Sequence, residues 1–368
     1  MDLLTKAQKA VTETEITKPN SNGNANANIK NTAESYNRKD FASDQDVRWC
    51  PGCGDYTILK QVQSTMPDIG VDKEDIVFIS GIGCAARFPY YMDTFGMHSI
   101  HGRAPAIATG LKVTRPELSV WIITGDGDSL SIGANHFAQI LRRNVDVNML
   151  LFNNEIYGLT KGQYSPTSHE GAVTKSTPVG SIDHPFNPLA FSMGSDGTFI
   201  ARVMDRDPRH MKSIMKRAHE HKGTSMVEIY QNCIVFNDGA FGVFTDKKTR
   251  PSEAIYLEHG EPLVFGQKKD KGVRLDSYKP EIVSLDEYSK DDLWIHDEKD
   301  KEKASLLSRF FDNVNDEHHM PRPFGVLYAG ERPCYEDGVN AQVEKEIATK
   351  GKGSLDDLLQ GTETWKIV

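Results

Sequence analysis

The sequence predicts an α/β fold, a parallel sheet with helices on both faces. Two short runs of bulky apolar residues, 118–124 and 147–152, have the length and composition of buried parallel strands. The segment 129–144 between them has a helical apolar face that includes Phe137 and Ile140. A strand–helix–strand unit is nearly always right-handed, so both strands should end at the same edge of the sheet.

The ends of these two strands carry the residues of a ligand site. Gly-Asp-Gly-Asp, residues 125–128, follows the first run, and Asn-Asn, residues 153–154, follows the second. Asp126 and Asn154 should therefore meet at the carboxyl edge, where α/β proteins hold their ligands. A carboxylate and an amide oxygen suit Mg²⁺ completed by phosphates and water, and the glycines and a helix start at Ser129 suit a diphosphate. The simpler alternative is a polar turn with a side-chain helix cap.

Five cysteines give a second signal. Their sparse, odd number without a secretory signal argues against a disulfide framework. A tight Pro-Gly turn separates Cys50 from Cys53, while Cys84 and Cys233 each follow an apolar run that predicts a strand. Alone, the pair fits a redox couple, half of a zinc site or part of an iron–sulfur site. Zinc is the weaker interpretation, because its structural sites usually take two nearby Cys or His pairs.

Taken together, these motifs resemble the β subunits of 2-oxoacid:ferredoxin oxidoreductases, and within them the 2-oxoglutarate type. The stretch from Asp126 to Asn154 resembles the thiamine-diphosphate motif, and Asn-Asn-Glu-Ile-Tyr-Gly-Leu-Thr-Lys-Gly-Gln at 153–163 is close to the β-subunit form. Trp-Cys-Pro-Gly-Cys-Gly, Gly-Ile-Gly-Cys, Asn-Cys-x-x-Phe and His-Gly-Arg match the same family. The likeness covers about residues 48–244 and implies a thiamine-diphosphate-binding fold.

The resemblance implies a set of binding residues. For one 4Fe-4S cluster the implied ligands are Cys50, Cys53, Cys84 and Cys233. For Mg²⁺ they are Asp126, Asn154 and the carbonyl of Ile156. The implied contacts to thiamine diphosphate are Ile82, Gly83, Cys84, Ala85, His101, Gly127, Asp128, Gly158 and Leu159. Cys334 has no counterpart in the family and is expected to be a small apolar residue of the tail.

Two further residues are candidates for a direct part in the reaction. His101 could transfer a proton or donate a hydrogen bond at the reacting carbon, or it could be a structural turn histidine. Arg87 could clamp a second substrate carboxylate, which would favour 2-oxoglutarate over pyruvate. The alternatives for Arg87 are an ion pair with Asp93 or a contact with a partner subunit.

The activity implied by the resemblance is oxidative decarboxylation of a 2-oxoacid with coenzyme A, with electrons passing singly through the cluster to ferredoxin; the family can also run in reverse. The glutamate that activates thiamine has no match in this chain, so an α subunit should supply it in an αβ or (αβ)₂ assembly. Pyruvate and branched-chain 2-oxoacids remain alternative substrates. A cluster-free thiamine-diphosphate decarboxylase or synthase and a zinc-stabilised interaction protein remain as more distant alternatives.

The rest of the chain suggests three parts: a polar, Asn-rich disordered arm at 1–40, the binding domain at 41–250, and an irregular C-terminal extension at 251–368 that packs on the core or the partner. Within the extension, 305–311 predicts a short helix and 321–328 an extended segment. The net charge of −9 without a basic stripe argues against nucleic acid, and no apolar run approaches the ~20 residues of a membrane helix. Thiolates that hold a cluster need a reducing compartment, so the cytoplasm is expected.

Overall fold

The structure is a computed structural model that describes residues 36–312, 319–363 and 365. Of the predicted disordered arm at 1–40, residues 1–35 lie outside the described residues. Its last residues belong to η2 (Arg38–Phe41), a 3₁₀ turn that is capped by the Asn37 side chain and that buries Phe41. Regular structure is therefore present before the predicted domain boundary at residue 41.

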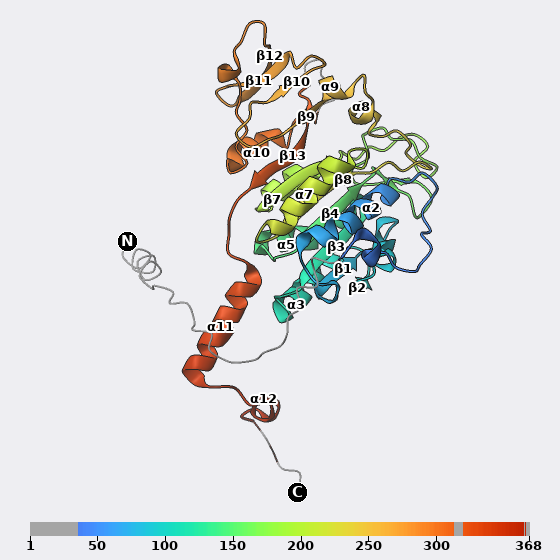
Figure 1. Ribbon diagram of the computed structural model, residues 1–368. Helices are drawn as coiled ribbons and strands as arrows, with labels where there is room; N and C mark the ends of the chain where they lie inside the picture. The colour runs from blue at the N-terminus through green and yellow to red at the C-terminus, as the bar shows by residue number, and fades with distance from the viewer. Residues whose placement is uncertain (1–35, 313–318, 364, 366–368) are drawn as a thin grey trace. The chain divides into compact units, whose positions relative to one another are not determined.

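In the described chain, eight strands form one sheet (Figure 1). From one edge to the other they are β2 (Phe95–His98), β1 (Ile76–Ser80), β3 (Ser119–Gly125), β4 (Asn148–Asn153), β8 (Ser225–Tyr230), β7 (Phe199–Met204), β13 (Arg322–Ala329) and β9 (Ala254–Tyr256). The first six are parallel, and β13 is antiparallel to β7. The predicted α/β fold is confirmed, and the runs that the sequence assigns to strands all lie in this sheet.

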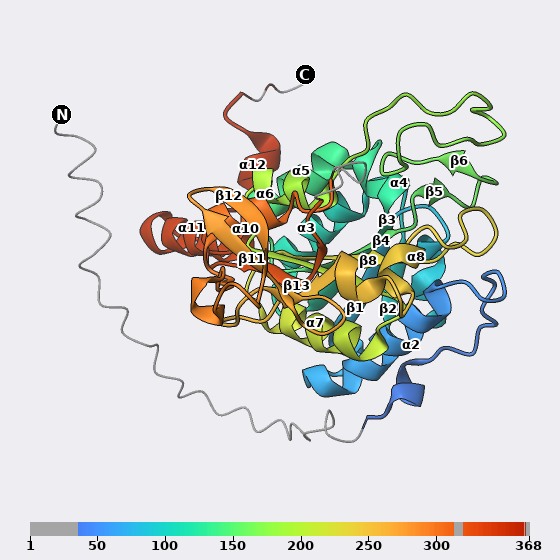
Figure 2. The same cartoon turned by 90° about the horizontal axis from the view of Figure 1, so that it is seen from above.

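Strand side chains alternate between two apolar cores, one on each face of the sheet. Ile122 and Leu151 belong to one core, whereas their neighbours Ile123 and Phe152 belong to the other. The first core is covered by α3 (Ala104–Thr114), α5 (Ala134–Arg143) and α6 (Pro188–Gly194), and the second by α2 (Asp55–Thr65) and α7 (Pro208–Glu220). Figure 2 shows these helices on opposite sides of the sheet.

The helix predicted at 129–144 is divided into α4 (Asp126–Leu130) and α5. The chain turns at 131–133 because Gly133 lies directly against the backbone of Asp128 and Gly102, where a Cβ would collide. This close approach brings the Gly-Asp-Gly-Asp turn against the loop that carries His101. The sequence pattern could not predict the interruption, since the apolar face continues across it.

Beyond residue 250 the chain adds a small sheet and then returns to the large one. The three-stranded antiparallel sheet is formed by β10 (Val264–Phe265), β11 (Lys271–Asp276) and β12 (Lys279–Ser284). The helix predicted at 305–311 is α10 (Lys301–Leu307); it begins earlier because the Asp300 side chain accepts a hydrogen bond from the Lys303 N–H. β13 then pairs with β7 and β9, so the C-terminal segment completes the main sheet.

The remaining elements lie in connections or, in the case of the last two helices, after β13. They are η3 (Met66–Ile69), η4 (Lys73–Asp75), η5 (Ala85–Tyr91), β5 (Ile156–Tyr157), β6 (Gln163–Tyr164), α8 (Gly242–Thr245), α9 (Arg250–Glu253), η6 (Lys290–Asp292), α11 (Tyr335–Lys350) and α12 (Leu355–Gln360). No helix within the described ranges has the length and apolar composition needed to cross a bilayer.

A buried ion pair joins the strands at the centre of the sheet. Arg202 Nε on β7 lies 2.6 Å from Glu228 Oε2 on β8, and each side chain is 1% exposed. The Glu228 carboxylate also accepts a hydrogen bond from Asn153 Nδ2 on β4 at 2.8 Å. Such a pair stabilises little relative to apolar residues, but removal of one partner leaves an uncompensated buried charge.

We therefore expect Arg202→Met to lower the free energy of unfolding by about 3–5 kcal/mol, because Glu228 would stay buried without its cation. Urea denaturation monitored by circular dichroism would measure the loss. Arg209→Met, at an exposed site on α7, is the matched control and should change stability by about 0.5 kcal/mol or less. Equal losses for the two variants would contradict the importance of the pair.

Candidate active site

The loops that follow β1, β3 and β4 enclose a cavity of about 110 Å³ at the carboxyl edge of the sheet. All residues predicted to contact the cofactor line it: Ile82, Gly83, Cys84, Ala85, His101, Gly127, Asp128, Gly158 and Leu159. The predicted magnesium ligands Asp126, Asn154 and Ile156 line the same cavity. The two strand ends therefore meet as the right-handed crossover requires, while the roles of these residues stay predictions.

Asp126 is the buried carboxylate of this cavity. Its Oδ2 accepts hydrogen bonds from the hydroxyls of Thr167, at 2.7 Å, and of Ser165. Burial raises the pKa of Asp126, although these two hydroxyls oppose the shift. A carboxylate, an amide and a backbone carbonyl are the hard oxygen donors that Mg²⁺ prefers, and a cation would favour the charged form of Asp126.

Asn154 is held in a defined orientation beside Asp126. Its Oδ1 accepts a hydrogen bond from the Ile156 N–H at 3.2 Å, and its Nδ2 donates to Gln231 Oε1 at 2.8 Å. Between them, Glu155 takes a left-handed φ of 55°, which turns the chain so that Asn154 and Ile156 both reach the cavity. The donor set predicted for Mg²⁺ is thus assembled by one tight turn after β4.

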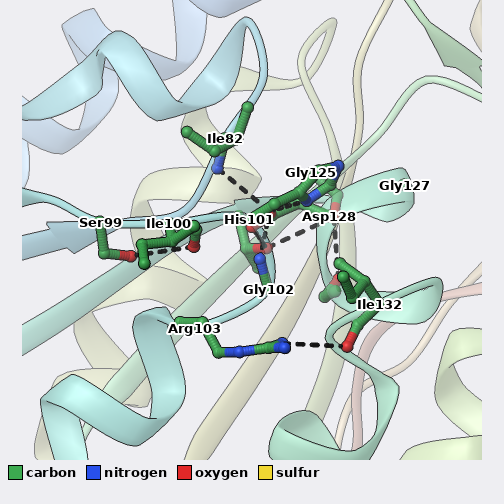
Figure 3. Close-up of polar contacts among 12 residues, drawn as sticks. Ile82, Ser99, Ile100, His101, Gly102, Arg103, Gly125, Gly127, Asp128 and Ile132 are labelled. Atoms are coloured by element: carbon green, nitrogen blue, oxygen red, sulfur yellow. Dashed lines mark hydrogen bonds and ion pairs between the residues drawn. The ribbon is translucent and has the colours of Figure 1, made fainter.

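Asp128 ties the surrounding loops together, as Figure 3 shows. Its Oδ1 accepts hydrogen bonds from the Ile82 N–H at 3.0 Å, the Gly102 N–H at 2.7 Å and His101 Nδ1 at 2.5 Å. Its Oδ2 accepts one from the Thr124 hydroxyl at 2.7 Å. The carboxylate is therefore fully engaged by its own chain, so its contribution to a diphosphate site is to hold the loops that form the cavity.

The contact with Asp128 also sets the tautomer of His101. A carboxylate only accepts, so Nδ1 of His101 carries a proton, and Nε2 is the ring nitrogen that is left to accept or return one. His101 lines the cofactor cavity, and its ring lies edge-on to Tyr157 with the centroids 6.5 Å apart. An imidazole held in this way can accept or return a proton inside the cavity.

The four cysteines of the predicted cluster site line a second cavity of about 260 Å³: Cys50, Cys53, Cys84 and Cys233. A Cβ built on Gly158 would lie 3.5 Å from the sulfurs of both Cys84 and Cys233, so the glycine keeps this space open. Burial raises the pKa of Cys84 to about 12 and raises that of Cys53 further. A cationic centre beside Cys53 and Cys84 would favour their thiolate forms.

The four thiols lie around a cavity rather than around one point. Within the part of the chain that the structure describes, no three Cys, His, Asp or Glu side chains converge on a position for a single ion. Four thiols instead surround a cavity with apolar walls that include Trp49 and Phe236. Sulfurs spaced around a cavity, rather than around a point, are what a multi-iron cluster requires.

Arg87 lies at the mouth of these cavities. It lines the cysteine cavity and an adjoining open cavity of about 650 Å³ that also contains Arg48 and His98. Its guanidinium donates to the Arg48 carbonyl at 3.3 Å. Asp93, the alternative partner, forms an ion pair with Lys73 instead, so the Arg87 side chain remains directed to the open cavity.

The sequence interpretation missed two residues that lie between the cavities. Asp55 lines both of them, and its side chain is buried beside the Cys53 thiol. Burial raises the pKa of Asp55 to about 7, with the neighbouring Cys53 thiol opposing and Asp205 reinforcing the shift. Gln231 is 1% exposed and contacts both Asn154 and Cys53. Only their adjacency to cysteine motifs could have indicated them.

Comparisons with known proteins agree with this geometry. The family model of the thiamine pyrophosphate enzyme C-terminal TPP binding domain matches residues 81–229. The 2-oxoglutarate oxidoreductase subunit KorB of Mycobacterium tuberculosis is 47% identical over 93% of this chain and 91% of its own length. The 2-oxoacid:ferredoxin oxidoreductase β subunit of a Sulfolobus species is 45% identical over 80% of this chain and 85% of its own length.

A solved structure is similar over nearly the whole chain. It is a 2-oxoglutarate:ferredoxin oxidoreductase from Magnetococcus marinus, with 2-oxoglutarate, coenzyme A and succinyl-CoA bound. Its TM-score is 0.71 at 30% identity, and the match covers 90% of this chain and 97% of that one.

Asp128→Ala should weaken thiamine diphosphate binding about tenfold or more, because the N–H groups of Ile82 and Gly102 and the Thr124 hydroxyl would lose their common acceptor. Calorimetric titration with thiamine diphosphate and Mg²⁺ would measure the affinity. Asp75→Ala, at an exposed site before β1, should leave it unchanged. An Asp128→Ala variant with wild-type affinity would show that the loops do not depend on this carboxylate.

Proposed function

This chain belongs to the β subunits of the 2-oxoacid:ferredoxin oxidoreductases, and we propose that with an α subunit it oxidatively decarboxylates 2-oxoglutarate. Coenzyme A would take the acyl group to give succinyl-CoA and CO₂, and ferredoxin would take the electrons, in a reaction that can also run in reverse. The observation that carries this proposal is the junction of two cavities, one lined by the thiamine motif and one by four thiols, which share Cys84 and Gly158.

The first cavity would hold thiamine diphosphate and Mg²⁺. Asp126, Asn154 and the Ile156 carbonyl would bind the metal. Gly127 lets the Tyr157 ring pack directly on its Cα, since a Cβ there would collide with that ring. When bound, the cofactor supplies the carbanion-stabilising chemistry that a 2-oxoacid needs to lose CO₂. The protein positions the reactants, and His101 Nε2 is the group placed to accept or return a proton.

The second cavity would hold one 4Fe-4S cluster on Cys50, Cys53, Cys84 and Cys233. Thiolate-bound iron–sulfur centres cover the low reduction potentials that ferredoxin reduction demands. Because Cys84 lines both cavities, the electron acceptor would lie against the site where the substrate is decarboxylated. A cluster-free thiamine enzyme would leave these four thiols without a function.

Arg87 supports 2-oxoglutarate over pyruvate or a branched-chain acid. The open cavity beside Gly83 is lined by Arg87 and by Arg48, and also by Asp44 and Asp46, of which Asp46 is paired with Arg48. Arg87 is therefore the guanidinium of this cavity that is left for a second substrate carboxylate. The relatives from Mycobacterium tuberculosis and Magnetococcus marinus are also named for 2-oxoglutarate.

The α subunit is expected to complete the site. The cofactor cavity of about 110 Å³ is well below the roughly 300–1,000 Å³ of a complete ligand pocket. On the edge strand β2 and the loop that follows it, the apolar side chains of Phe95, Met97 and Ile100 are 62%, 47% and 73% exposed, as expected of a surface that a partner covers. We propose an αβ or (αβ)₂ enzyme of the cytoplasm.

The activity is tested by ferredoxin reduction with purified αβ complex and several 2-oxoacids. We expect turnover with 2-oxoglutarate and none with the β chain alone. Arg87→Ala should lower kcat/KM for 2-oxoglutarate about 10- to 100-fold more than for pyruvate, because a charge-assisted contact to the second carboxylate is lost. Arg142→Ala, at an exposed site, is the control. Equal losses on the two substrates would remove the specificity role of Arg87.

The cluster is tested by the metal content of anaerobically purified protein. Wild type should contain about four iron and four sulfide per chain, and serine at Cys50, Cys53, Cys84 or Cys233 should reduce both. Cys334→Ser is the matched control, since Cys334 is buried and free but lies outside the cysteine cavity. Zinc in place of iron, or full iron in all four variants, would refute the assignment.

A further inference from the structure

Gln231 lines the cysteine cavity and contacts Asn154, which lines both cavities, and its backbone fixes this position. It is the first residue after β8, and its N–H donates to the Asn153 carbonyl at 2.9 Å, which continues the pairing of β8 with β4. Two residues later comes Cys233, a wall of the cysteine cavity. The side chain is only 1% exposed, so its amide must find its partners inside the protein.

The amide of Gln231 has three partners. Its Oε1 accepts from Asn154 Nδ2 at 2.8 Å. Its Nε2 donates to the Asn232 carbonyl at 2.7 Å and to Cys53 Sγ at 3.2 Å. One side chain therefore contacts a proposed Mg²⁺ ligand on one side and a proposed cluster ligand on the other.

These contacts fix the orientation of two side-chain amides, first that of Gln231 and then, through it, that of Asn154. The Asn232 carbonyl can only accept, so Gln231 must present its NH₂ group to it, and its oxygen must face Asn154. That oxygen can only accept as well, so Asn154 must present its own NH₂ group to Gln231. The Asn154 oxygen is then left to point away from Gln231, and it is the atom that a cation would bind.

The approach of the Cys-Pro-Gly-Cys-Gly loop to Gln231 depends on its last glycine. A Cβ on Gly54 would lie 2.0 Å from Asp205 Oδ2 and 3.0 Å from both Gln231 Cγ and the Asn232 nitrogen. The Gly54 N–H also donates to the Asn232 carbonyl at 3.1 Å. The loop is thus built to lie directly on Gln231, and the contact between Gln231 and Cys53 is a consequence of that packing.

We propose that Gln231 is a positioning residue that orients Asn154 for Mg²⁺ and, through its hydrogen bond to Cys53, raises the reduction potential of the cluster. This inference rests on the proposed function. The reduced cluster carries more negative charge than the oxidised one, so a donor to one of its sulfurs stabilises the reduced form. The same side chain would then influence both the cofactor that releases electrons and the centre that accepts them.

The test uses the purified αβ complex with Gln231→Leu, which keeps the size of the side chain but removes both contacts. Redox titration followed by electron paramagnetic resonance should show a cluster midpoint potential below that of wild type. Titration of the metal-free complex with Mg²⁺ in the presence of thiamine diphosphate should show an affinity about 10- to 100-fold weaker.

A second variant separates the two effects. Gln231→Glu keeps an oxygen for Asn154 but replaces the donor facing Cys53 with a second carboxylate oxygen. It should lower the midpoint potential while the Mg²⁺ affinity stays close to wild type. Gln63→Leu is the matched control: Gln63 is 5% exposed and donates to the Tyr91 carbonyl, outside both cavities, so neither quantity should change.

The outcomes distinguish this inference from the proposed function. Absence of iron from wild type would refute the cluster itself. Iron in wild type with a Gln231→Leu potential equal to that of Gln63→Leu would overturn the role of Gln231 at the cluster, and unchanged Mg²⁺ affinity would overturn its role at Asn154. If Gln231→Leu does not retain the cluster, the potential of Gln231→Met, which also lacks both contacts and adds no charge, decides in the same way.

Discussion

The cofactor edge of this protein depends on the carboxylate of Asp128. Its oxygens accept hydrogen bonds from Ile82, His101, Gly102 and Thr124, which lie on three separate loops or strand ends. Each donor left unpaired in the interior would cost about 1–3 kcal/mol, so the loops are stable together rather than separately. Cys84 lies two residues beyond Ile82 in the same loop. The hydrogen bonds of Asp128 that shape the cofactor cavity therefore also position Cys84, which lines the cysteine cavity.

A second set of polar contacts runs from this edge into the core. Thr167 donates to Asp126 and contacts Asn153, and Asn153 in turn donates to Glu228, which is paired with Arg202. Every member is buried, and each is joined to the next by a hydrogen bond or an ion pair. Such a network gives a unique arrangement only if it is complete, so the position of Asp126 depends on an ion pair two strands away.

The sequence was sufficient for features that follow from strand order. Apolar runs located the strands, and the handedness of the crossover brought Asp126 to Asn154. The sequence was insufficient where contacts with segments distant in the chain determine the ends of an element or the partners of a side chain. The helix at 129–144 is interrupted because Gly133 packs on another loop, and α10 begins at Lys301 because of its cap. Gln231 could not be recognised, since its partners come from segments far away in sequence.

The place of β13 in the sheet has a consequence for biosynthesis. β13 pairs with β7, and Arg202 on β7 reaches the carbonyl of Pro323, 121 residues later in the chain. While the ribosome is still adding those residues, β7 is an unpaired edge strand and Arg202 lacks this acceptor. The sheet is thus completed only after residues 322–329 have been added, and until then β7 presents an unpaired edge to which another strand can bind.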